Sequence, residues 1–210
     1  MKTKSEEIFE NFLNLNNLSF EKIEEVLVKG AHRPDYLVQV GNGQIVFEVK
    51  ELTEDDSFTE ELNVAYSGKI GEHVRRLIRT SKKQIQYGAN QGIPSVLLIY
   101  NCVDRVSDFG TSNVDFTSAM YGEPTMLFNR ETKERTDLFN GRNDTLQPLK
   151  NTSFSAVGRL TDMYKKTEDE AIQVILFENA FAKVKLPFDE LPSCIEVHRV
   201  EVSREPMSFS

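Results

Sequence analysis

A Gly-Asn-Gly turn between two β-rich runs is the feature of this sequence that most constrains the fold. The runs cover residues 35–40 and 44–50, and Gly41, Asn42 and Gly43 separate them. Two such runs joined through Asn-Gly are typical of a β-hairpin with a two-residue turn. The sequence therefore predicts a hairpin here, with Asn42 and Gly43 at the centre of its turn.

The length of this turn decides which side chains of the hairpin share a face. A two-residue Asn-Gly turn places Asp35 opposite Lys50 and Leu37 opposite Glu48. With any even-length loop, Asp35, Glu48 and Lys50 lie on one face of the pleat, whereas a three-residue loop moves Asp35 to the other face. We expect the even-length loop and therefore a cluster of two acids and a lysine.

Apolar spacing predicts helices and strands around the hairpin. Residues 4–15 have the apolar spacing of a helix, and a weaker strand-like stretch follows at 23–28. The acidic stretch 51–62 is expected to be a solvated loop. A long helix is predicted over 68–87, with glycines after it as stop signals. Residues 95–100, SVLLIY, are continuously apolar and indicate a central buried strand.

The second half of the chain is predicted to be rich in β-structure. Short β-like runs alternate with polar, turn-rich segments, namely TMLF and TDLF around an exposed hairpin tip, SFSAVGRL, QVILF and IEVHRVEV. No repeat or linker divides the chain. We therefore expect a core at residues 1–103 and a β-rich extension at 104–210 that packs on it.

The composition limits the partners of the protein. A formal net charge of -8 argues against coating nucleic acid by bulk charge, because phosphate binding needs clustered Lys and Arg. The N-terminal residues lack the apolar segment of a signal peptide, and no apolar run approaches the roughly 20 residues that span a bilayer. Cys102 and Cys194 lie far apart and suggest reduced thiols. We expect a soluble, cytoplasmic protein with no membrane partner.

The two acids and the lysine of the hairpin suit metal-dependent phosphoryl chemistry. Two carboxylates about 5.5 to 8 Å apart across neighbouring strands can share a hard divalent cation. A lysine beside them can orient or deprotonate a water and offset charge on a phosphoryl oxygen. The alternative is that Asp35, Glu48 and Lys50 only decorate the solvated face of the hairpin.

The motif and the order of elements around it resemble a known superfamily. Pro34-Asp35, twelve intervening residues and Glu48-Val49-Lys50 lie on a hairpin that follows a helix and precedes a long helix and a buried strand. This pattern resembles the PD-(D/E)XK phosphodiesterase superfamily, whose fold is the restriction-endonuclease-like fold.

The resemblance covers about residues 4–101 and implies both a fold and a chemistry. The implied fold is α/β (α+β), with an αβββαβ core around a mixed four-stranded sheet. The implied chemistry is Mg²⁺- or Mn²⁺-dependent hydrolysis of nucleic-acid phosphodiesters. Asp35 and Glu48 match the metal-binding acids of the superfamily, and Lys50 matches its catalytic lysine.

Two further site residues follow from the resemblance. Members often add a glutamate from the first helix, for which Glu6 is our first choice, Glu10 the second and Glu7 the least suitable by its place on the helical wheel. An acidic first turn favoured by the helix dipole is the alternative for each. A glutamine on the long helix often points toward the site, and Gln84 fits this role better than Gln86.

The long helix also carries a basic cluster. Arg75, Arg76, Arg79 and Lys82 are expected to bind the phosphate backbone, supported by Lys69 and Lys83 and opposed only by Glu72. A solvated helix face is the alternative reading. Further along, SFSAVGRL and FENAFAKVKLPF resemble the C-terminal part of poorly characterised bacterial relatives of the same fold.

The resulting hypothesis is a metal-dependent nuclease with Mg²⁺ or Mn²⁺ as cofactor. DNA is the expected substrate and RNA the second choice, and a homodimer is left open. The first alternative is a catalytically vestigial module of the same fold that binds nucleic acid or another partner. The second is a small-solute hydrolase on an unrelated α+β fold, for which the sequence offers no grouped nucleophile, base and orienting residue.

Overall fold

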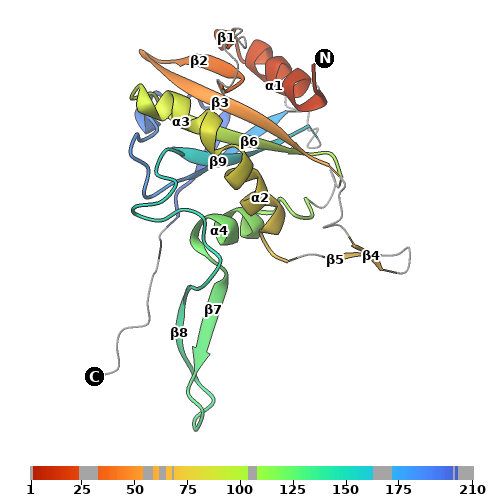
Figure 1. The fold of residues 1–210 in the computed structure, drawn as a ribbon, viewed down its shortest axis with the longest axis vertical. Coiled ribbons are helices and arrows are strands. Elements are labelled where there is room, and N and C mark those ends of the chain that lie inside the picture. Colours follow the sequence, from red (N-terminus) through yellow and green to blue (C-terminus); the bar gives the residue numbers. More distant parts are fainter. Residues whose placement is uncertain are drawn as a thin grey trace.

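The computed structural model shows a mixed α/β protein built on one seven-stranded sheet (Figure 1). It describes the backbone and side chains of most of the chain, and the backbone alone of 59–61 and 65–67. The residues described are 2–23, 33–53, 59–61, 65–67, 69–103, 108–162, 172–200 and 202.

The central sheet mixes parallel and antiparallel strands. Its strands in spatial order are β1 (Phe20–Lys22), β2 (Tyr36–Val40), β3 (Gly43–Leu52), β6 (Ser95–Asn101), β9 (Ala156–Thr161), β10 (Gln173–Glu178) and β11 (Ile195–His198). Strands β1, β2 and β3 form an antiparallel meander, and β3, β6 and β9 run parallel. Strand β10 is antiparallel to β9, and β11 is parallel to β10.

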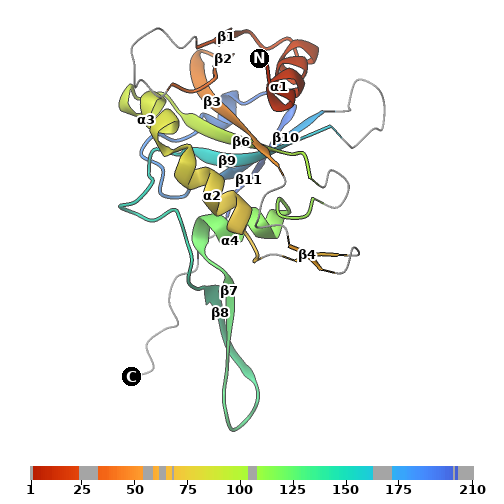
Figure 2. The same cartoon turned by 45° about the vertical axis from the view of Figure 1, so that its right-hand side comes forward.

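Helices cover both faces of this sheet (Figure 2). The helices of the described residues are α1 (Lys4–Leu15), α2 (Glu72–Thr80), α3 (Lys82–Asn90) and α4 (Asn113–Tyr121). The buried side chains of α1 join one apolar cluster, and those of α2, α3 and α4 join another on the opposite face. The helix predicted at 4–15 is confirmed. The one predicted at 68–87 is two helices, because the chain departs from helical geometry at the buried residue Ser81, where ψ is 0°.

Strand β3 presents different chemistry to the two faces. Ile45, Phe47 and Val49 belong to the cluster beneath α1. Successive side chains of a strand alternate between faces, so Glu48 and Lys50 face the side covered by α2 and α3. Glu48 and Lys50 therefore lie on the opposite face of β3 from α1.

The β2–β3 hairpin has the expected loop parity but a different register. Its ladder pairs Val40 with Gly43 and Tyr36 with Phe47, so Gly41 and Asn42 form the turn instead of Asn42 and Gly43. Gly41 has φ +55°, a left-handed value that glycine adopts without steric cost. The predicted pairing is therefore wrong by two residues, whereas the even loop length is confirmed.

Two segments of the first half differ from expectation. Strand β1 ends just before the stretch 23–28 that is expected to be strand-like; Ile23 is not part of a strand, and residues 24–28 lie outside the described part. The acidic stretch 51–62 was expected to be a loop, but its first two residues extend β3, where Leu52 pairs with Asn101 of β6. Its last described residues form β4 (Thr59–Glu61), which pairs with β5 (Ala65–Ser67).

The second half supplies the β-structure that its sequence predicts. Strands β7 (Pro124–Phe128) and β8 (Arg135–Asn140) form the expected hairpin, and β9, β10 and β11 cover the other predicted runs. These last three strands continue the central sheet beyond β6, so the sheet has seven strands and not the four that the resemblance implied. Every residue of β6 is buried, as is typical of a central strand, and β6 pairs with β3 on one side and β9 on the other.

Helix α4 was not anticipated, although its N-terminus carries a recognisable signal. Ser112 accepts a hydrogen bond from the backbone of Asp115, and Asp115 accepts one from the backbone of Ser112. This reciprocal pair is a capping box, which stabilises the first turn of a helix.

The second half of the chain also contacts the predicted core. Glu190 Oε2 accepts a hydrogen bond of 2.7 Å from Asn42 N in the β2–β3 turn.

Candidate active site

Asp35 is held against strand β3 at the point where the β2–β3 ladder ends. Its backbone N–H donates to Phe47 O at 3.1 Å, and its Oδ2 accepts from Val49 N at 2.7 Å. The carboxylate thus replaces the backbone carbonyl that would otherwise continue the ladder. Because Tyr36 pairs with Phe47, Asp35 lies directly across from Glu48.

Glu48 is a buried acid with one satisfied oxygen and one open oxygen. Its side chain is 2% exposed, and Lys50 Nζ lies 2.5 Å from its Oε1. Its Oε2 is buried and receives no hydrogen bond from any described residue. Lys50 is partly exposed and reaches solvent beside it. The arrangement is a recessed carboxylate pair, Asp35 and Glu48, with a lysine at its solvent side.

The electrostatics of the pair favour an added positive charge. Burial and then the negative charge of Asp35 raise the pKa of Glu48 to about 7, although Lys50 acts in the opposite direction. Burial also raises the pKa of Asp35, against the hydrogen bond from Val49. Burial lowers the pKa of Lys50, but the charge and hydrogen bond of Glu48 together with the charges of Asp35 and Glu6 outweigh this effect, and the net shift is upward. Two carboxylates in one buried site repel each other unless a proton or a cation lies between them.

We expect the repulsion between Asp35 and Glu48 to appear in the pH dependence of the free energy of unfolding. A carboxyl whose pKa is raised on folding binds its proton more tightly in the native state, so the free energy of unfolding falls as the pH rises from about 4.5 to about 7. Denaturant unfolding in EDTA should show this loss between about pH 4.5 and about pH 7, and Glu48→Gln should remove most of it. An identical pH profile for the two proteins would show that Glu48 titrates normally.

The oxygens of Asp35 and Glu48 fit a hard divalent cation that keeps part of its water shell. Mg²⁺ is commonly bound through one or two carboxylates together with water and substrate phosphate. The open Oε2 of Glu48 is a ligand position that no protein donor occupies in the described structure. No group of three or more His, Cys, Asp or Glu that could hold a metal occurs in the described part of the chain, so such a site would depend on these two acids.

The first-helix glutamates are engaged elsewhere. Glu6 Oε2 accepts from Thr3 N at 2.8 Å and completes the N-terminal capping box of α1. Glu10 accepts from Tyr36 Oη at 2.8 Å and lies 3.1 Å from Lys22 Nζ. Neither joins Asp35 and Glu48 in a group of three acids. The Thr-x-x-Glu spacing before an apolar run is the sequence signal that predicts the capping role of Glu6.

Glu51 connects the same strand to α1 and was not singled out from the sequence. Its Oε1 accepts a hydrogen bond of 2.9 Å from Ser5 N. This N–H belongs to the first turn of α1, whose amides have no partner inside the helix and favour a negative charge. Glu51 therefore anchors α1 to β3 from the face opposite Glu48 and Lys50.

Helix α3 brings Gln84 to the face of the sheet that carries Glu48 and Lys50. The apolar contacts of α3 join the cluster on that face, and Gln84 Oε1 is buried without a hydrogen-bond partner among the described residues. One turn further along, the Tyr87 ring lies under Arg33, with 5.7 Å from Cζ to the ring centroid. Arg33 directly precedes Pro34-Asp35 in the sequence, and this proximity to the motif is the signal that could have identified it as a residue near the site. Gln86 is half-buried.

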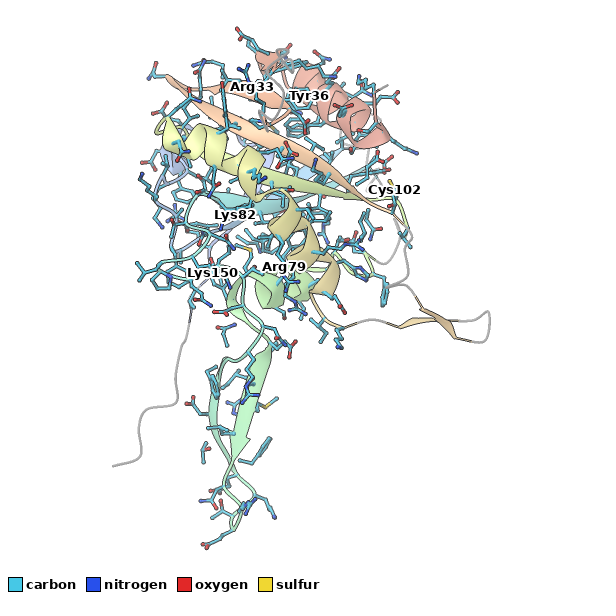
Figure 3. All side chains as sticks on the ribbon, in the orientation of Figure 1. Arg33, Tyr36, Arg79, Lys82, Cys102 and Lys150 are labelled. Carbon is cyan, nitrogen blue, oxygen red and sulfur yellow. The ribbon has the colours of Figure 1, made fainter. Side chains whose placement is uncertain are left out.

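The basic side chains of α2 and α3 divide into a buried and a surface group. Arg75 is buried. Its Nη2 donates a hydrogen bond of 2.6 Å to Ile70 O and lies 3.7 Å from Glu123 Oε1. This residue faces α4 and not the solvent. Arg79 and Lys82 are exposed at the junction of the two helices (Figure 3), as is Lys83, and Arg76 is half-buried.

Arg159 of β9 is a second buried cation that the sequence did not single out. Lys50 of β3 pairs with Ile99 of β6, and Ile99 pairs with Arg159 of β9. Lys50 and Arg159 are therefore at the same level of the sheet, with strand β6 between them. Arg159 Nη1 donates to Asp108 Oδ2 at 2.7 Å and to Thr111 O at 3.1 Å. Its charge is therefore matched by an acid, and it fixes the segment that leads into α4.

Comparisons with family models, with curated proteins and with solved structures found no match for this chain. No helix in the described residues combines the length and the apolarity that crossing a membrane requires.

Proposed function

We propose that this protein is a divalent-metal-dependent nuclease of the PD-(D/E)XK type that hydrolyses phosphodiester bonds of nucleic acid, with DNA as the expected substrate. The proposal rests on the chemistry of the recessed acid pair and on the elements around it. It assigns metal binding to Asp35 and Glu48 and transition-state stabilisation to Lys50.

The order of elements in the first half supports a restriction-endonuclease-like core. Helix α1, the meander β1–β2–β3, the helices α2 and α3 and the parallel strand β6 follow one another in that order. This matches the αβββαβ succession if the small β4–β5 pair is treated as an insertion and α2–α3 as one interrupted helix. The acid-bearing hairpin is then the second and third strand of the core, as the resemblance requires.

The observation that carries the proposal is the open oxygen of Glu48. A buried carboxylate without a donor costs free energy, and a second acid beside it raises that cost. An arrangement of this kind is favourable once a cation lies between the two acids. A hairpin face that is only solvated would leave its acids in water, whereas Glu48 is buried.

Each residue of the site has a defined task in the proposed reaction. Asp35 and Glu48 would hold Mg²⁺ or Mn²⁺, which supplies Lewis-acid polarisation of the phosphate and a lower pKa for its bound water. Lys50 orients the attacking water and offsets the negative charge that develops on the phosphoryl oxygens. Gln84, whose Oε1 has no described partner, can accept a hydrogen bond from that water.

Cleavage and metal binding by the wild-type protein test the proposal directly. We expect plasmid, linear duplex, single-stranded DNA or RNA to be cut with Mg²⁺ or Mn²⁺ and not with EDTA. Calorimetry should detect Mn²⁺ uptake. No cleavage of any of these substrates together with no Mn²⁺ uptake would end the enzyme hypothesis.

The surface cations of α2 and α3 should govern the salt dependence of nucleic-acid binding. We expect the combined Ala variant of Arg76, Arg79 and Lys82 to weaken binding across sequences and to flatten the plot of log affinity against log salt. Each lost phosphate contact lowers that slope by about 0.7 to 0.9. Fluorescence anisotropy at several salt concentrations, in Ca²⁺ to prevent cleavage, measures it.

A matched variant separates this effect from a change in net charge. Replacing the exposed residues Lys4, Lys150 and Lys183 with Ala removes the same number of positive charges outside α2 and α3, and we expect its slope to stay close to that of the wild type. Equal slopes for both triple variants would assign the helix cations to an ordinary solvated face. Arg75 is left intact in both variants because it is buried.

A catalytically vestigial module of the same fold is the second candidate. The engagement of Glu6 in the α1 capping box favours it, because the acid pair then has no third protein carboxylate. Such a module would bind nucleic acid without cutting it, and its binding would not depend on Mn²⁺ or on Glu48.

A further inference from the structure

Arg33 carries a positive charge near the acid pair that no described acid balances. It lies just before β2 (Figure 3), two residues ahead of Asp35. Among the residues that the structure describes, its guanidinium forms no ion pair, and it lies over the Tyr87 ring instead. Lys50 differs, because its Nζ is paired with Glu48. The N–H groups of Arg33 are therefore able to bind an added anion.

Tyr87 is fixed in position by the close packing of α3 on the sheet. The next residue, Gly88, touches β3 and β6, since a Cβ atom added there would lie 2.9 Å from Val46 Cγ2 and against Ser95 Oγ. This contact sets α3 at the level of Val46, which is two residues before Glu48 and on the same face of β3. The half-buried Tyr87 ring is therefore a fixed support near the acid pair.

Arg33 and Asp35 lie on one face of the sheet. Tyr36 belongs to the apolar cluster beneath α1, so Asp35 faces the opposite side, where α3 packs. The contact of Arg33 with Tyr87 of α3 places it on that side too. Residues two apart in an extended chain have Cα atoms roughly 6 to 7 Å apart, and Pro34 favours an extended conformation at Arg33. One nucleic-acid strand can therefore contact both.

The chemistry of a guanidinium held on an aromatic ring suits a phosphate. The strongest effects of neighbouring charges on the pKa of Asp35 come from Lys50, Glu6 and Lys22, so Arg33 is not the cation that balances this acid. Its planar N–H fork matches two phosphate oxygens, and the ring contact leaves that fork available. A side chain ordered before binding also loses less entropy when the ligand arrives.

We propose that Arg33, supported by Tyr87, binds the phosphate next to the scissile phosphate in the substrate strand. The inference rests on the proposed function, in which the acid pair, its metal and Lys50 act on the scissile phosphate. Arg33 forms no ion pair with either acid, so the phosphate it binds is a neighbouring one. Arg33 is a substrate-binding residue, and Tyr87 is a positioning residue that acts through it.

Substrates with one neutralised phosphate test the proposal. Once the cleavage position in a short DNA duplex is mapped, a methylphosphonate replaces one or the other phosphate beside it and removes one negative charge. We expect the KM of the wild type to rise about 10-fold at one of these positions, as for the loss of a hydrogen bond to a charged group. Arg33→Ala should show the higher KM with the unmodified duplex and no further rise with that methylphosphonate. A variant that responds to the methylphosphonate as the wild type does, or a wild type that responds at neither position, overturns the proposal.

Matched variants separate phosphate binding from packing. Arg130→Ala removes an exposed arginine between β7 and β8 and should retain the wild-type KM. Arg33→Lys keeps the charge without the fork and should recover part of the affinity. Tyr87→Leu removes the ring and should raise KM more than Tyr87→Phe, which retains it. Equal KM values for these two Tyr87 variants contradict the role of the ring.

Binding measurements distinguish failure of this inference from failure of the proposed function. Fluorescence anisotropy with the same duplex in Ca²⁺ needs no cleavage, and Arg33→Ala should weaken binding about 10-fold even if the wild type does not cut. Cleavage by the wild type together with unchanged Kd and KM for Arg33→Ala overturns this inference alone. A wild type that binds neither DNA nor RNA overturns both.

Discussion

Lys50→Ala should reduce metal-dependent cleavage by at least about 10²-fold, the usual effect of removing a group that stabilises developing charge in the transition state. The fold should remain intact, because Lys50 lies at the solvent side of the site and is not part of either apolar cluster. Its proposed work is done in the transition state, so substrate affinity should change less than the cleavage rate. Single-turnover cleavage under saturating metal measures the effect.

Metal binding by this variant needs to be measured above neutral pH. Lys50 lowers the pKa of Glu48 through its charge and its hydrogen bond, so its removal lets a proton compete more strongly with the cation. At pH 8 we expect Mn²⁺ uptake to be largely retained.

Lys185→Ala is the control for the loss of cleavage. It removes another lysine that forms an ion pair, with its Nζ 3.9 Å from Glu178 Oε1, and it should cut at the wild-type rate. Cleavage by Lys50→Ala at the wild-type rate would remove the lysine from the mechanism.

Glu48→Ala should abolish both Mn²⁺ uptake and cleavage. The variant removes the buried carboxylate that supplies the open oxygen Oε2 and leaves Asp35 as the remaining acid of the pair. Its stability in EDTA above pH 7 should not fall much, because the cost of burying a charge disappears together with the side chain. Calorimetry with Mn²⁺ and chemical denaturation, run on the same preparation, measure the two effects.

Glu51→Gln is the matched control for this prediction. Glu51 lies on the same strand but on the opposite face, where it accepts from Ser5 N. Its replacement should cost about 0.5 to 2 kcal/mol of stability, as for other N-terminal helix contacts, and should leave metal uptake unchanged. If Glu48→Ala bound Mn²⁺ as tightly as Glu51→Gln, the metal site would have to lie elsewhere.

The two variants at the site also separate the three hypotheses for the hairpin. A solvated hairpin face predicts that neither Lys50→Ala nor Glu48→Ala matters, and a vestigial module predicts no cleavage even by the wild type. The nuclease hypothesis predicts an asymmetry, in which the lysine variant loses activity alone and the glutamate variant loses activity and metal together.

Local patterns in the sequence determined much of the first half of the structure. The α1 helix, the β2–β3 hairpin and the buried strand β6 follow from apolar spacing and from a glycine-bearing turn, which act over a few neighbouring residues. The shared face of Asp35, Glu48 and Lys50 followed from loop parity alone, because strand side chains alternate with a period of two. An error of two residues in the register left that face unchanged.

Features that depend on distant contacts were decided only by the tertiary structure. Arg75 and Arg79 look alike in a basic helix, yet Arg75 is buried beside Ile70 and Glu123 because α4 packs there. Glu51 could not be assigned to the N-terminus of α1 before the helix and β3 were seen together, whereas the capping role of Glu6 has a local signal in the Thr-x-x-Glu spacing. The sequence by itself determined the local elements and the face of the acid pair, since these depend on periodicity. The seven-stranded sheet, the isolation of Glu48 Oε2 and the contact of Arg33 with Tyr87 were decided by packing between segments that lie far apart along the chain, which no local pattern encodes.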